Sequence, residues 1–134
     1  MEFNIADLFE RVADLCADRT AVVCGDERCT YRSLDDRSTA LAHVLRDLGA
    51  APGDHVGCYM ANSIAHVETM LACYKLRAVP VNVNYRYVDD ELAYLFADAD
   101  LVGVVHDAAV RDRAERAAAA TPSVRFVLDG SGSE

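Results

Sequence analysis

From residue 55 onward, four short apolar runs alternate with three segments of helical length, and this alternation constrains the fold more than any other feature. The runs lack the polar alternation of half-exposed strands, so they are typical of strands that are buried on both faces. We therefore expect an α/β fold, with an open, mainly parallel βαβ sheet and helices on both faces. The expected strands are 55–60, 78–83, 101–105 and 124–128.

The residues before this alternation predict a helix, a short hairpin and a second helix. The hairpin is expected from strands at 21–24 and 29–31. Ser33 and Asp36 resemble a capping box for the second helix, and Gly49 is placed to end it in a left-handed conformation. Apolar residues in the first segment recur at the steps of three and four that characterise an amphipathic helix: Ile5, Leu8, Phe9, Val12 and Leu15.

The three helices between the expected strands also carry start signals. Asn62 is placed to cap the first of them. The carboxylates of 89–91 suit the positive end of the second helix, and an Ala-rich helix is expected at 107–120. Pro80 cannot donate to a strand ladder, so we expect a sheet edge, a bulge or a strand end there.

Composition limits the classes of partner. The chain has 134 residues, with 22 acidic and 13 basic side chains and a net charge of -9. Without a basic cluster, we expect no nucleic-acid partner. With no apolar run of about 18 residues and no signal peptide, we expect no transmembrane segment and a cytoplasmic location. Residues 1–128 are expected to form one domain, and the Gly- and Ser-rich residues 129–134 a flexible tail.

The five cysteines include no Cys-x-x-Cys pair, so reduced core thiols are the favoured interpretation. Cys24 and Cys29 flank residues 25–28 and would face one another if that tetrapeptide is a hairpin loop. Metal or redox use of this pair is the less favoured alternative, because no further ligands follow at the spacing of a zinc site.

The usual signatures of nucleotide chemistry are missing from the sequence. Neither Gly-x-Gly-x-x-Gly nor a Walker loop occurs. Lys75, the only lysine, ends a helix, where we expect it to face solvent and the negative end of the dipole instead of a phosphate. The pairs 35–36 and 89–90 lie at helix starts and are interpreted as caps and solvated charges, not as a metal or acid-base site.

Two features follow the carboxyl ends of strands, where open α/β sheets bind ligands. His106 is the histidine best placed for such a crevice, although a structural or solvated role is favoured. Residues 85–87 could contribute to a ligand site, but we favour tyrosine rings packed over the sheet edge, with Arg86 paired to Asp89 or Asp90. We assign no residue a catalytic, cofactor-binding or metal-binding role.

Five motifs occur in an order that resembles one known family. The first three are T-Y-R-S-L-D at 30–35, L-G-A-A-P-G-D-H-V at 48–56 and M-A-N-S at 60–63; the others are L-A-C-Y-K-L-R-A-V-P-V-N-V-N-Y-R-Y at 71–87 and E-L-A-Y at 91–94. Together they resemble the amino-terminal segment of the adenylate-forming acyl-CoA synthetases, the AMP-binding ligases of fatty acids and related carboxylic acids. The resemblance covers about residues 5–128, and the N-Y-R-Y form is most similar to bacterial fatty-acyl-CoA synthetases.

The resemblance implies a two-step reaction for the full-length enzyme. A carboxylate attacks the α-phosphate of ATP with Mg²⁺ to give an acyl adenylate and pyrophosphate, and coenzyme A then forms the thioester. The phosphate loop and the catalytic lysine of the family lie beyond Glu134. We therefore expect this chain alone to bind none of ATP, Mg²⁺ or CoA and to be inactive.

The alternative is a non-catalytic interaction or dimerisation module derived from such a ligase. Both interpretations leave exposed the face that further subdomains cover in the family, so self-association is expected. One local departure concerns Leu76 and Arg77, which stand where the family commonly has Gly. We expect another turn geometry there.

Overall fold

The computed structural model describes residues 3–131, which form two separate sheets and the helices around them. The amino-terminal part contains α1 (Ile5–Leu15), β1 (Thr20–Cys24), β2 (Glu27–Thr30) and α2 (Tyr31–Asp47). The remaining elements are β3 (His55–Tyr59), α3 (Ile64–Leu76), β4 (Val79–Asn82), α4 (Asp89–Asp98), β5 (Leu101–His106), the 3₁₀ helix η1 (Ala108–Val110), α5 (Arg111–Ala119) and β6 (Phe126–Asp129).

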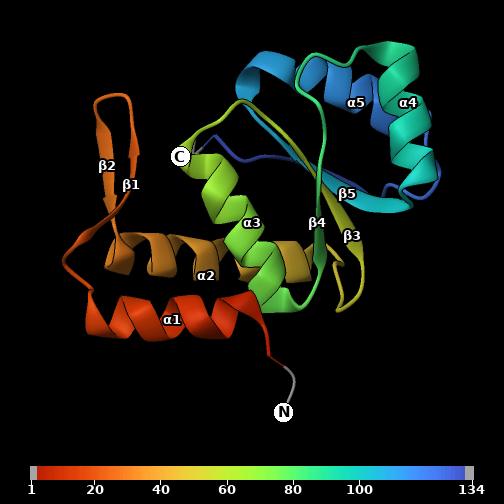
Figure 1. Ribbon diagram of the computed structural model, residues 1–134. Helices are drawn as coiled ribbons and strands as arrows, with labels where there is room; N and C mark the ends of the chain where they lie inside the picture. Colours follow the sequence, from red (N-terminus) through yellow and green to blue (C-terminus); the bar gives the residue numbers. More distant parts are fainter. Residues whose placement is uncertain (1–2, 132–134) are drawn as a thin grey trace.

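The four later strands form one parallel sheet in the order β4-β3-β5-β6. Helices α2 and α3 cover one face, whereas α4 and α5 cover the other (Figure 1). Val56 faces the first layer of helices with Ala72, and Tyr59 faces the second layer with Phe96. The predicted α/β fold, with a parallel sheet covered on both faces, is confirmed.

Pro80 lies on β4, an edge strand of the sheet, as predicted. Val79 N–H donates to the Asp54 carbonyl at 2.7 Å, and Val83 N–H donates to the Cys58 carbonyl at 3.1 Å. Because alternate residues of a strand turn their N–H groups to the same side, the Pro80 nitrogen points away from β3. The missing donor therefore costs the sheet no hydrogen bond.

Two helices begin beside the residues that were predicted to cap them. Thr30 caps α2 by accepting a 3.1 Å hydrogen bond from Ser33 N–H, so the prediction of Ser33 as the cap was wrong. Ser63, not Asn62, caps α3 by accepting a 3.1 Å hydrogen bond from His66 N–H. In contrast, α4 begins at Asp89 with three carboxylates in its first turn, as predicted.

The β1–β2 hairpin has a two-residue turn, Gly25-Asp26, instead of the four-residue loop we expected. Cys24 is therefore paired with Glu27, and Cys29 is opposite Val22. The prediction that the two cysteines face one another was wrong, because shortening the loop shifts the register. All five cysteines are free thiols.

Helix α1 forms as predicted and is capped by Asn4, but its large apolar residues do not make its main packing face. Ala6 and Ala13 are the buried residues of α1. Phe9 packs against the cluster that contains Leu34 and Leu71. The small side of the helix is therefore the side that meets α2 and α3, and much of the apolar stripe is left exposed.

The turn from α3 to β4 keeps a left-handed conformation without glycine. Arg77 has φ 64° and ψ 21°, so the expectation of another geometry was wrong. Its guanidinium donates to the Tyr74 carbonyl at 3.1 Å and to Asp7 at 2.8 Å. These contacts hold in place a backbone conformation that costs a residue with a Cβ about 1–2 kcal/mol.

Of the segment 129–134, which was predicted to be a flexible tail, the structure describes only the beginning. Asp129 is the last residue of β6, and Gly130 N–H donates to the His106 carbonyl at 2.7 Å. Residues 132–134 lie outside the described residues.

Candidate functional site

The sheet has a topological switch point between β3 and β5. The chain leaves β3 toward α3 on one face, whereas it leaves β5 toward η1 and α5 on the other (Figure 1). Two adjacent loops thus diverge at the carboxyl ends of the strands and leave a crevice, which is where open α/β sheets bind ligands. This edge is the candidate functional site.

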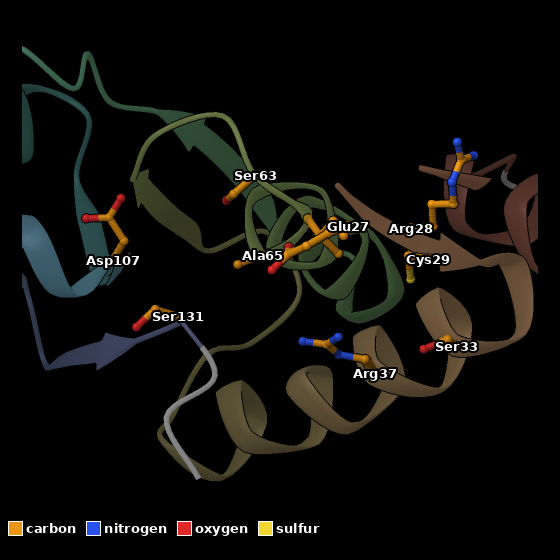
Figure 2. Close-up of a pocket in the computed structure, with 10 residues that line it drawn as sticks. Glu27, Arg28, Cys29, Ser33, Arg37, Ser63, Ala65, Asp107 and Ser131 are labelled. Carbon is orange, nitrogen blue, oxygen red and sulfur yellow. The ribbon is translucent and has the colours of Figure 1, made fainter. Parts of the chain in front are cut away.

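A cleft of about 410 Å³ lies at this edge, between the sheet, the hairpin and α2. Figure 2 shows the Arg37 guanidinium reaching from α2 toward the middle of the cleft, whereas Arg28 points away from it. The lining residues come from the hairpin, from α2, from the first turn of α3 and from the ends of β5 and β6: Glu27, Arg28, Cys29, Ser33, Arg37, Ser63, Ile64, Ala65, Asp107 and Ser131.

Positive charge enters the cleft from one side chain and one helix end. The Nε atom of Arg37 lies 2.9 Å from Oε1 of Glu68, whose side chain is buried. Burial raises the pKa of Glu68, and the nearby Arg37 offsets only part of that rise. The positive end of the α3 dipole also lies here, beside the Ser63 cap. The carboxylates of Glu27 and Asp107 also line the cleft and balance this positive charge, so the cleft can accommodate a small polar group.

The loops at the carboxyl edge are fastened to one another by two aspartates. Asp107 Oδ2 accepts a 3.0 Å hydrogen bond from Ala61 N–H, which links the ends of β5 and β3. Asp129 accepts hydrogen bonds from the hydroxyl and N–H of Ser131 and from Arg111. These bonds lower the pKa of Asp129 to about 2, so its carboxylate is ionised at neutral pH.

His106 has the structural role that we favoured. It is buried at the end of β5, and its Nδ1 atom lies 2.7 Å from the backbone oxygen of Asp107. The ring therefore helps to shape the loop after β5.

The tyrosines after β4 pack over the sheet, as favoured. Tyr85 and Tyr87 join the core cluster on the α4–α5 face, and the Tyr59 hydroxyl donates to the Tyr87 carbonyl at 2.7 Å. The predicted pairing of Arg86 was wrong, because Asp89 instead bonds Arg116 at 3.1 Å and, within residues 3–131, Arg86 forms no ion pair.

Lys75 is not at the surface, so the prediction of a solvent-facing lysine was wrong. Its side chain is only 7% exposed, and its ammonium lies 2.7 Å from both Glu10 and Asp35. Burial lowers the pKa of Lys75, but the hydrogen bonds to the two carboxylates outweigh this effect and raise it overall. The lysine joins α1, α2 and α3, and one member of the acidic pair 35–36 is its partner instead of a solvated charge.

In the part of the chain that the structure describes, no three His, Cys, Asp or Glu side chains are grouped as a metal site. No helix between residues 3 and 131 is long and apolar enough to span a bilayer.

Sequence analysis missed Arg37 and Ser131 as residues that line the cleft. The position of Ser131 just after the expected last strand was the available signal, because ligands bind at the carboxyl ends of strands in open α/β sheets.

The sequence matches the AMP-binding enzyme family over residues 9–134. It is 43% identical to the 3-oxocholest-4-en-26-oate–CoA ligase of Rhodococcus rhodochrous and 47% identical to the medium/long-chain-fatty-acid–CoA/3-oxocholest-4-en-26-oate–CoA ligase of Mycobacterium tuberculosis. Each alignment covers 96% of this chain but only 23% and 24% of the relative. The chain thus spans about a quarter of the length of these curated relatives.

Solved structures show the same architecture. The amino-terminal domain of FACL13 from Mycobacterium tuberculosis superimposes with a TM-score of 0.86 at 26% identity, over 96% of this chain and 34% of that chain. A benzoate CoA ligase from Burkholderia xenovorans has the same fold, with a TM-score of 0.86 at 22% identity over 96% of this chain and 26% of that chain. The chain therefore belongs to the AMP-binding enzyme family and corresponds to the amino-terminal segment of an acyl-CoA ligase.

Proposed function

We propose that this chain is the amino-terminal part of a fatty-acyl-CoA synthetase, which converts a carboxylic acid, ATP and CoA to acyl-CoA, AMP and pyrophosphate. The observation that carries the proposal is the match to relatives named as acyl-CoA ligases, at 43–47% identity over 96% of the chain. The location we propose for the enzyme is the cytoplasm.

The proposed substrate class is an apolar carboxylic acid. The two relatives are named for medium- and long-chain fatty acids and for a steroid carboxylate. These acids share one carboxylate on a large apolar body. The test compares fatty acids of increasing length with a steroid acid in the enzyme purified from its native cells, and activity only toward small aromatic or amino acids would contradict this class.

We further propose that the 134-residue chain is inactive by itself and binds none of ATP, Mg²⁺ or CoA. Adenylate formation brings a carboxylate against a phosphate, so it requires cations and N–H donors fixed around the developing charge. The only lysine is held between Glu10 and Asp35. The cleft offers Arg37, which already contacts Glu68, and the chain carries a net charge of -9 that disfavours a nucleotide.

Fatty-acid-dependent exchange of pyrophosphate into ATP tests the inactivity of the purified chain, with a complete acyl-CoA ligase as the positive control. We expect no exchange above the background without enzyme. Exchange that depends on added fatty acid would refute the proposed inactivity and would leave the family assignment intact.

The mass of the gene product in its native cells tests the larger proposal. A product several times heavier than 14.6 kDa that makes acyl-CoA supports it. A product of 14.6 kDa favours the alternative, a non-catalytic interaction or dimerisation module. The exposed apolar stripe of α1 is a surface that a partner could cover in that alternative.

A further inference from the structure

Helix α1 presents a row of apolar side chains that the described part of the chain leaves substantially exposed. Ile5, Leu8, Val12 and Leu15 are 57%, 51%, 41% and 81% exposed, and none belongs to a core cluster. The steps between them are three, four and three residues, so they lie along one side of the helix. We call these four residues the α1 seam.

The orientation of the seam is fixed by other contacts of the same helix. Ala6 and Ala13 are buried on the side of α1 that packs on the domain. The carboxylates of Asp7 and Glu10 bind Arg77 and Lys75, both of α3 or its end. Figure 1 shows α1 as the outermost layer beside α2, so the helix is held from one side and a second helix can approach from the other.

The residue types of the seam suit a particular partner. Ile5 and Val12 occupy one heptad position, and Leu8 and Leu15 occupy the other. Two-stranded parallel coiled coils prefer β-branched residues at the first of these positions and leucine at the second. The seam is therefore self-complementary under a two-fold axis. We propose that the α1 seam is a contact surface between two copies of this chain, with the two α1 helices parallel.

The flanks of the seam permit this pairing. In a parallel pair, Asn4 and Arg11 of one copy lie beside Phe9 and Cys16 of the other, so no like charges meet across the contact. An isolated helix of two heptads does not form stably in water. Here the helix is already folded by its Asn4 cap and by the two ion pairs to α3 and its end, so association does not carry the cost of ordering it.

The area of the seam indicates the class of interface that it can form. At the observed exposures, the four residues of two copies can bury at most roughly 900 Å², below the 1,200–2,000 Å² of a standard stable interface. We therefore expect a weak, reversible dimer. Each copy carries a charge of -9, so salt that screens this repulsion should strengthen the dimer. The inference does not depend on the proposed ligase activity.

Sedimentation equilibrium of the 134-residue chain over a concentration series, at low and high salt, measures the dimer. Val12→Glu tests the seam. Val44→Glu is the matched control, because Val44 is also an exposed helical valine, 42% against 41% exposed, but lies on α2. We expect Val12→Glu to raise the dissociation constant at least tenfold and Val44→Glu to change it less than twofold, with circular dichroism showing that both variants remain folded.

Leu15→Cys tests the direction of the helices. In the parallel pair the two copies of residue 15 adjoin, so mild oxidation should link this variant into a covalent dimer faster than it links the parent chain. In an antiparallel pair they lie at opposite ends of the contact. A chain that stays monomeric at every concentration overturns the proposal, as does a dimer that Val12→Glu does not weaken or that Leu15→Cys fails to cross-link.

Discussion

Replacing Arg77 by glycine and by alanine separates two opposing contributions at the turn between α3 and β4. The backbone of Arg77 is left-handed, with φ 64° and ψ 21°, which disfavours any residue with a Cβ. Its side chain, in contrast, is favourable through the ion pair to Asp7 and the hydrogen bond to the Tyr74 carbonyl. Alanine removes only the favourable side-chain contacts, whereas glycine removes these contacts and the backbone strain.

The exposures and backbone angles indicate which general magnitudes apply to each contribution. The side chains of Arg77 and Asp7 are 45% and 46% exposed, so their ion pair contributes about 0.2–1 kcal/mol. Left-handed strain costs about 1–2 kcal/mol, of which the larger entropy of unfolded glycine offsets about 0.5–1 kcal/mol. We therefore expect Arg77→Ala to be the least stable form, and Arg77→Gly to exceed Arg77→Ala by about 0.5–1 kcal/mol.

Urea unfolding of the three proteins measures these differences, and for a chain of 134 residues the Ala-to-Gly step corresponds to roughly 2–4 °C in Tm. Ala120→Gly is the matched control. Ala120 also ends a helix, but its φ is -87°, so glycine there relieves no strain and should lower stability. Equal stability of the glycine and alanine variants at position 77 would refute the reasoning, because the strain would then be no larger than the glycine entropy that offsets it.

Two further predictions concern buried charge. Lys75→Met leaves Glu10 and Asp35 without their shared cation, and urea unfolding should show a loss of stability of about 1–3 kcal/mol. The loss stays in this range because both carboxylates are partly exposed. The control, Arg32→Met, breaks only the exposed pair with Asp18 and should cost less than about 0.5 kcal/mol; equal losses would contradict a stabilising role for the buried Lys75 ion pairs. Asp129 has a pKa lowered to about 2, chiefly by its hydrogen bonds with Ser131, so it stabilises the fold fully above its unfolded value near 3.9 and loses that effect as pH falls toward 2. The stability difference between the parent and Asp129→Asn should therefore shrink as urea unfolding is repeated from about pH 5 to about pH 2, and a constant difference would contradict this assignment.

The sheet and its two layers of helices were predictable because burial on both faces leaves a direct trace in the sequence. Residues such as Val56 and Val104 must be apolar wherever they point. Pro80 was placed at an edge for a similarly local reason, since a missing donor is tolerated only there. The ordered motifs then added the family, which composition and periodicity alone do not supply.

The parts that sequence analysis missed depend on choices between equivalent neighbours or on contacts between distant residues. Thr30 and Ser33 are both good caps, and the choice of Thr30 follows from β2 running directly into α2. Lys75 looked exposed because its partner Glu10 lies 65 residues away and Asp35 lies 40 residues away. The cleft escaped notice for the same reason, because its lining comes from segments that only the fold brings together.

The outward-facing nitrogen of Pro80 makes the two margins of the parallel sheet unequal. A strand docking alongside β4 would find no donor at Pro80, where a regular ladder requires one. The β6 margin, Phe126–Asp129, contains no proline and retains its backbone donors. An added strand, from another polypeptide segment or from an aggregating neighbour, therefore pairs more readily with β6 than with β4. A screen for aggregation-resistant variants should begin with substitutions in β6.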